Sequence, residues 1–116
     1  MRIPRPAAAL TAATLCLLAA SAAAQTASPP ATIDAARQAY YIGQYGRALD
    51  AFERLARERG NAEAAESAAF MLMQGPSLYG PEVQRDVDRA GRWLLQAARA
   101  GRPGAQFMLN MLPQAD

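Results

Sequence analysis

The stretch ALDAFERLARERG, residues 48–60, decides the expected fold, because a second version of it, RAGRWLLQAARAG, follows 41 residues later at 89–101. Three kinds of position match between the two copies. They are a bulky aromatic residue (Phe52 and Trp93), a small residue (Ala56 and Ala97) and a final glycine (Gly60 and Gly101). A fixed period with matching apolar, small and glycine positions is typical of a helical repeat.

The first copy has the pattern of an amphipathic helix over residues 47–59. Its apolar residues recur at i, i+1, i+4, i+7 and i+8, and they are Ala48, Leu49, Phe52, Leu55 and Ala56. The other face carries two acid-before-base pairs four residues apart, Asp50–Arg54 and Glu53–Arg57, and Asp88–Arg92 is a similar pair in the second copy. We therefore expect these helices to bury one stripe and to expose their charges to solvent.

Capping and stop signals divide residues 34–112 into five helices. The helices are expected to begin near Asp34, Arg47, Ala62, Asp86 and Pro103. Each is followed by a residue that ends a helix, namely Gly43, Gly60, Gly75, Gly101 and Pro113. The predicted fold class is all-α: a short α-solenoid of stacked antiparallel helical hairpins, with about two and a half repeats. Residues 25–33 are expected to be a disordered lead-in and residues 113–116 a C-terminal tail.

Residues 1–24 have the pattern of a secretory signal. A positive start at Arg2 and Arg5 leads into an alanine-rich apolar run, which small residues end before an expected cut at Ala24–Gln25. The run is less apolar than the roughly 20 strongly apolar residues of a membrane span. A retained membrane anchor, or lipidation at Cys16, stays open as an alternative. Cleavage predicts an exported protein, periplasmic or secreted.

Loss of the signal changes the charge balance. The whole chain has 12 basic and 10 acidic residues and a formal net charge of +2. Because Arg2 and Arg5 leave with the signal, 10 basic residues then balance 10 acidic ones. The mature chain is formally neutral, so its charge does not predict binding of nucleic acid or of an anionic membrane.

The chain from residue 25 onward contains no histidine, cysteine or lysine. It therefore lacks the commonest general base, the thiolate and amine nucleophiles, and the usual ligands of zinc, copper and haem. Glu82, Asp86 and Asp88 cluster near the start of the fourth helix, but they do not match a calcium-binding loop. Acids at a helix start stabilise its positive end. We expect a non-catalytic protein without a cofactor or a metal ion.

These segments resemble the Sel-one-like repeat family, a branch of the tetratricopeptide-like helical hairpins. The family pattern A-E-A-Q-x-x-L-G-x-M-Y-x-x-G is similar to AEAAESAAFMLMQG at 62–75, G-V-x-x-D to VQRD at 83–86, and A-x-x-W-x-x-x-A-A-x-x-G to AGRWLLQAARAG at 90–101. The resemblance covers nearly all of the mature chain. It implies a scaffold or adaptor that binds other proteins, tied in exported bacterial members to the cell envelope.

The chain departs from the family pattern at a few positions. Ala69 and Glu82 replace common glycines, and Leu72 replaces a common tyrosine. The period of 41 also implies about five extra residues, which we place at Pro76–Gly80. Insertions in repeat proteins map to loops on one face, which is often the binding face.

The last expected helix is polar only at Gln106 and Asn110. A helix that is apolar nearly all round expects burial on more than one side, and the preceding helix covers only part of it. We therefore expect an exposed apolar end that docks a protein partner or a second copy, made of Phe107, Met108, Met111 and Leu112. As an alternative, residues 113–116 or the N-terminal segment fold over it.

Aromatic side chains add two candidate partner-binding residues. Tyr79 lies in the inserted loop and is expected to be exposed, whereas Trp93 occupies a core position of the family pattern. Tyr40 and Tyr41 are adjacent on a helix, so one is expected in the core and Tyr41 is taken as the surface residue.

The leading function is a protein-interaction module. The alternative is a cell-wall glycan binder in which Tyr79 and a surface tyrosine stack on sugar rings.

Overall fold

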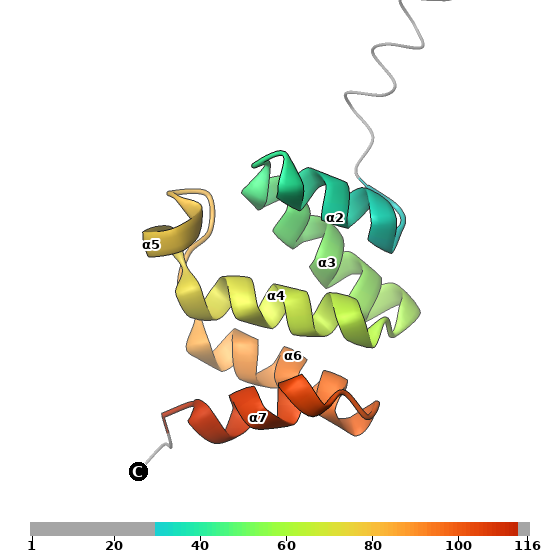
Figure 1. The fold of residues 1–116 in the computed structure, drawn as a ribbon, viewed down its shortest axis with the longest axis vertical. Helices are drawn as coiled ribbons and strands as arrows, with labels where there is room; N and C mark the ends of the chain where they lie inside the picture. The colour runs from blue at the N-terminus through green and yellow to red at the C-terminus, as the bar shows by residue number, and fades with distance from the viewer. Residues whose placement is uncertain (1–29, 114–116) are drawn as a thin grey trace, which may run out of the picture.

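The computed structural model describes residues 30–113 (Figure 1). The predicted signal at 1–24 and its cleavage site lie outside the described residues. The described chain is all-helical, without strands, and its helices are α2 (Ile33–Tyr41), α3 (Tyr45–Arg59), α4 (Ala62–Gln74), α5 (Pro76–Tyr79), α6 (Val87–Arg99) and α7 (Pro103–Met111).

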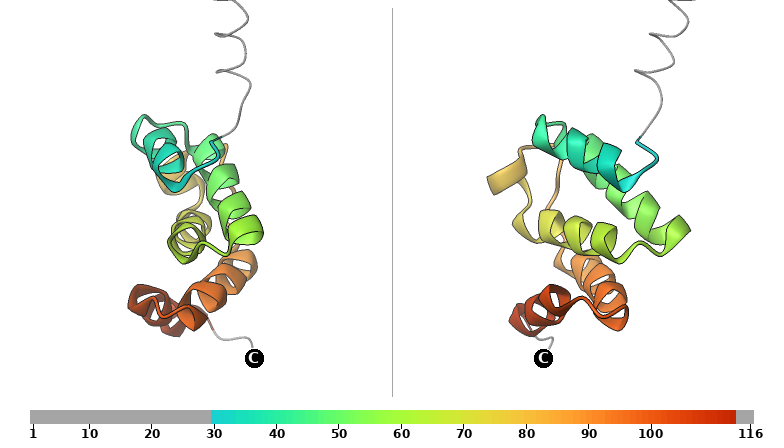
Figure 2. Two further views of the ribbon diagram at one scale, coloured as in Figure 1. Left: turned by 90° about the vertical axis from the view of Figure 1, so that its right-hand side faces the viewer. Right: turned by 45° about the vertical axis from the view of Figure 1, so that its right-hand side comes forward.

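The long helices lie in two layers. Figure 2 shows α2, α4 and α7 on one side of the molecule and α3 and α6 on the other. Helix α3 packs against α2 and α4, and α6 packs against α4 and α7. Helices α3 and α6, which we call the outer helices, therefore each contact two helices of the layer formed by α2, α4 and α7.

Local signals place most helix ends correctly. The side chain of Asn61 accepts a hydrogen bond from the backbone N–H of Ala64 at 2.8 Å, as its capping role predicts. Gly60 ends α3 with a φ of 62°, in the left-handed region, and Pro103 occupies the first turn of α7. These predictions are confirmed.

The first two helices start earlier than expected. Thr32 caps α2 by accepting a hydrogen bond from the N–H of Ala35 at 3.1 Å, so the helix begins at Ile33. Asp34 lies inside the first turn and forms an ion pair with Arg37. Helix α3 begins at Tyr45 rather than at Arg47, because the turn after α2 is shorter than the glycines at 43 and 46 suggested.

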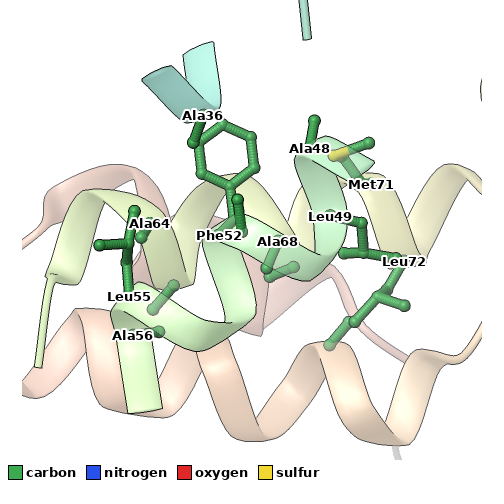
Figure 3. Packing of buried hydrophobic residues seen from close by; sticks show 14 of the residues in the cluster. Ala36, Ala48, Leu49, Phe52, Leu55, Ala56, Ala64, Ala68, Met71 and Leu72 are labelled. Atoms are coloured by element: carbon green, nitrogen blue, oxygen red, sulfur yellow. The ribbon is translucent and has the colours of Figure 1, made fainter. Parts of the chain in front are cut away.

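The core is rich in alanine. Four alanines of α4 are fully buried, which lets neighbouring helices approach closely, and they are Ala64, Ala65, Ala68 and Ala69. Larger side chains fill the space between the layers, and Phe52 projects from α3 toward Ala36 of α2 (Figure 3). The residues expected to face inward on α6 were Ala90, Leu94, Ala97 and Ala98; the first three are buried and Ala98 is half-buried. The apolar stripes predicted from the sequence therefore make the core.

The inserted segment is not a free loop. Residues Pro76–Tyr79 form the short helix α5, and Tyr79 is only 5% exposed. Its hydroxyl lies 2.8 Å from the hydroxyl of Tyr40, and its ring packs edge-on against the rings of Tyr40 and Tyr45. The prediction of an exposed Tyr79 is therefore wrong, because aromatic residues of α2 and α3 provide a surface on which its ring is buried.

Burial raises the pKa of Tyr79, and the hydrogen bond to Tyr40 raises it further. Since the folded state binds the phenolic proton more tightly than the unfolded state, ionisation favours unfolding once the pH exceeds the ordinary tyrosine value of about 10. We expect the free energy of unfolding to fall above this pH, and to fall less steeply in Tyr79→Phe. Urea unfolding at neutral and alkaline pH measures this; equal pH slopes in the two proteins would contradict it.

A polar seam joins the outer helices α3 and α6. Glu53 is only 3% exposed, and its carboxylate accepts hydrogen bonds at 2.7 Å from Nε of Arg89 and at 2.7 Å from Nε1 of Trp93. The side chain of Gln96 donates to the backbone carbonyl of Ala56 at 2.9 Å. Trp93 is half-buried, with its indole N–H turned to this seam.

The seam overturns the prediction of a solvated Glu53–Arg57 pair. Glu53 faces α6 rather than solvent, and its ion-pair partner is Arg89, which lies 36 residues later. The ion pairs found within residues 30–113 do not include Asp50–Arg54 or Asp88–Arg92 either. The contacts between α3 and α6 therefore determine the ion-pair partner of Glu53, and the spacing of four residues within one helix does not.

Candidate functional site

A groove with a volume of about 280 Å³ opens on the layer formed by α2, α4 and α7. Helices α2 and α4 supply most of its walls, Phe52 of α3 contributes from beneath, and α7 adds one methionine. We call this surface the α2–α4 groove; its lining residues are Arg37, Tyr40, Tyr41, Phe52, Glu63, Glu66, Ser67, Phe70 and Met108.

Both carboxylates that line the groove, Glu63 and Glu66, form ion pairs with arginines. Nε of Arg37 donates to Glu63 at 2.8 Å, and Arg37 also pairs with Asp34. Arg102, which precedes α7, donates to Glu66 at 2.8 Å. These hydrogen bonds raise the pKa of both arginines. Each groove carboxylate is therefore matched by a guanidinium, and these pairs tie α4 to both neighbours in its layer.

Exposed aromatic rings flank these ion pairs. Tyr41 is 76% exposed and Phe70 is 39% exposed. Tyr40, its neighbour in the sequence, is half-buried, so one tyrosine of the pair faces inward and one outward as expected. Large apolar side chains at the rim of a groove are typical of a binding surface rather than of a plain solvated helix face.

Phe70 was not among the predicted site residues, although the sequence carried a signal for it. Glu63, Glu66, Ser67 and Phe70 follow i, i+3, i+4 and i+7, so they share one side of α4. That side is opposite the buried alanines. A phenylalanine on the charged side of an amphipathic helix is the pattern that indicates an exposed binding residue.

The predicted apolar end of α7 is divided between two places. Phe107 and Met111 are 66% and 64% exposed, and neither lines the α2–α4 groove. Met108 is half-buried and does line that groove. Leu112 is half-buried at the end of α7, where its Cδ1 lies close to Gly91 of α6. The structure thus brings Tyr41 and Met108 to one groove and leaves Phe107 and Met111 on a separate face.

The acidic residues near the start of α6 support the fold. Asp86 caps α6 by accepting a hydrogen bond from the N–H of Arg89 at 3.0 Å. Glu82 accepts one from the N–H of Gly46 at 3.2 Å, which fixes the turn between α5 and α6 against the start of α3. Over residues 30–113, no group of three or more carboxylates is placed to hold a metal ion.

None of the helices described between residues 30 and 113 is both long and apolar enough to cross a membrane. No family model, curated protein or solved structure matches the chain.

Proposed function

We propose that this chain is a non-catalytic protein-interaction module, an adaptor or scaffold exported to the bacterial periplasm or cell envelope. The observation that carries the proposal is the α2–α4 groove, in which exposed Tyr41 and Phe70 flank ion pairs that are already complete. The resemblance to Sel-one-like repeats and the signal pattern at residues 1–24 support the same function and location.

The two-layer packing supports a short α-solenoid. Helices α2, α4 and α7 would then be the first helices of successive hairpins, and α3 and α6 the second helices. The repeated stretches at 48–60 and 89–101 fall on α3 and α6, as a repeat requires. In this arrangement the α2–α4 groove lies between the first helices of two adjacent repeats.

The groove favours a protein segment over a small ligand. Its volume of about 280 Å³ is near the lower limit of small-molecule sites, which are roughly 300–1,000 Å³. Since Glu63 and Glu66 are paired with arginines, the groove offers no free charge to select a charged ligand. An apolar side chain presented by an amphipathic helix would instead bury the rings of Tyr41 and Phe70.

The glycan alternative loses its main residue. It relied on Tyr79, whose ring is buried against Tyr40 and Tyr45. The pair of exposed tyrosines that this alternative needs is therefore not formed, and the second exposed ring beside Tyr41 is that of Phe70. Retention of the purified protein on peptidoglycan, in the absence of other proteins, would favour that alternative.

The proposal predicts that Tyr41→Ala and Phe70→Ala weaken partner binding. Cross-linking of the exported protein in cells, followed by mass spectrometry, identifies the partner, and titration of that partner measures the dissociation constant. Each variant is expected to raise it by about tenfold or more, because exposed aromatic anchors dominate binding energies. Leu95→Ala on α6 is the matched control, since Leu95 is also exposed but lies in the other layer. Unchanged affinity in both groove variants would refute the groove as the binding site.

A further inference from the structure

Helix α7 has an outer face that the α2–α4 groove does not use. Gln106, Phe107, Asn110 and Met111 are all exposed, and their spacing of i, i+1, i+4 and i+5 places them on one side of the helix. We call these four residues the α7 outer face. Helix α7 packs against α6 on its other side and lies at the end of the molecule (Figure 1).

The α7 outer face carries no charge. Residues 103–113 contain no acidic or basic side chain, whereas each of α2, α3, α4 and α6 carries at least two. Arg85 lines a hollow together with Met111 at one edge of this face, but α7 itself offers a charged partner surface no ion pair in return for the hydration that it would lose. A neutral surface is the better match, and the same face of a second copy is neutral.

The polar groups of this face are also self-complementary. Gln106 and Asn110 have amide side chains, and an amide is both a donor and an acceptor of hydrogen bonds. Two copies of an amide can therefore pair with each other, which two carboxylates or two guanidinium groups cannot do. Phe107 and Met111 can likewise pack on their own copies. Such a face suits a twofold contact in which both chains use the same patch.

We propose that a second copy of this chain docks on the α7 outer face and forms a twofold dimer, α7 against α7. The proposal deepens the protein-interaction function proposed above, since the dimer presents two α2–α4 grooves to a partner. Bivalent presentation strengthens binding to a partner that carries two copies of the recognised segment.

An open chain of copies is disfavoured by the other end of the molecule. Head-to-tail stacking would press α7 of one copy against α2 of the next. Asp34 of α2 has a side chain that is 88% exposed, and it would be buried against an uncharged surface. The symmetric contact avoids this desolvation.

The dimer is expected to be weak. A helix of nine residues is about 14 Å long, so a contact made by α7 alone falls short of the roughly 800 Å² per partner of a standard stable interface. We therefore expect a monomer–dimer equilibrium that depends on protein concentration.

Sedimentation equilibrium of the protein purified from the periplasm tests the proposal. The expected result is a reversible monomer–dimer equilibrium, which Phe107→Glu weakens by about tenfold or more because it brings two like charges together. Leu95→Glu is the control: it also replaces an exposed apolar side chain by a carboxylate, but on α6, and it is expected to leave the equilibrium unchanged. Mixing Phe107→Glu with Phe107→Arg is expected to restore dimers, because opposite charges then meet.

Three results would overturn the dimer: a monomer at every concentration, open-ended growth into larger species, or dimerisation unaffected by Phe107→Glu. Circular dichroism of each variant establishes that it is folded, which the exposure of Phe107 leads us to expect. Partner capture is measured in parallel. If the protein binds its partner but does not dimerise, only the dimer proposal is overturned. If it dimerises but its affinity for the partner is unchanged by Tyr41→Ala and Phe70→Ala, only the assignment of the α2–α4 groove as the binding site is overturned.

Discussion

Replacement of Glu53 by alanine is expected to destabilise the fold by about 2 kcal/mol, because it removes the buried carboxylate of a hydrogen-bonded ion pair. The carboxylate is almost fully buried and holds both Arg89 and Trp93 of α6. Its loss leaves the indole N–H of Trp93 without an acceptor. The arginine can regain water because its side chain is 42% exposed, which keeps the effect below that of a fully buried pair.

Urea unfolding followed by circular dichroism measures the effect of Glu53→Ala. Glu58→Ala is the matched control, because Glu58 lies on the same helix and is exposed, and its effect is expected within about 0.5 kcal/mol of zero. Glu53→Gln keeps the size of the side chain and one acceptor, so its effect should be intermediate. Equal stability of Glu53→Ala and Glu58→Ala would contradict the polar seam between α3 and α6.

Replacement of Gly75 by alanine is expected to destabilise the fold by about 3 kcal/mol or more, since it combines a strained backbone with a steric clash. Gly75 has φ 63° and ψ −149°, a conformation that is nearly restricted to glycine. A Cβ atom there would lie 2.6 Å from Cβ of Arg85 and 2.9 Å from its backbone nitrogen. The backbone atoms of Arg85 cannot move aside cheaply, because Asp86 next to it donates its N–H to the carbonyl of Leu72.

Gly60→Ala separates the two contributions to this effect. Gly60 also has a positive φ, 62°, but a Cβ there would meet no atom within 4 Å. Its replacement is expected to cost only about 1–2 kcal/mol, the usual price of a left-handed backbone for alanine. The difference in thermal and urea stability between the two variants therefore measures the close approach of Arg85. Similar losses in both would contradict it.

Local sequence signals predicted the helices well. Caps such as Asn61, stops such as Gly60 and Gly75, and the apolar stripe of α3 act within one or two turns, so the sequence around each is sufficient. The exposed face of α7 was also foreseeable in part, because α7 carries no charged side chain and the preceding helix covers only one of its sides, which leaves apolar groups such as Phe107 exposed.

The errors arose where distant segments meet. Glu53 looked solvated beside Arg57, since nothing nearby in the sequence shows that Arg89 and Trp93 lie against it. Tyr79 looked exposed in an insertion, because its burial depends on Tyr40, which is 39 residues away. These contacts depend on how the two layers stack, which local periodicity does not determine.

The candidate site was predicted only in part for the same reason. Tyr41 and Met108 were named from separate helices, but the groove that brings them together forms only when α2, α4 and α7 share a layer. Phe70, which lies in that groove, was overlooked because the apolar character of α4 was assigned to its core.

The most direct test of the proposed function is site-specific photo-cross-linking in cells, with the reactive group at position 70 in the groove and, in a second protein, at position 95 on α6. Both side chains are exposed, so neither replacement disturbs the core. If the groove binds a protein partner, we expect a discrete cross-linked protein adduct from position 70 and none from position 95. The adduct from position 70 should be lost when Tyr41→Ala is added. Adducts of equal yield from both positions, or none from position 70, would contradict it.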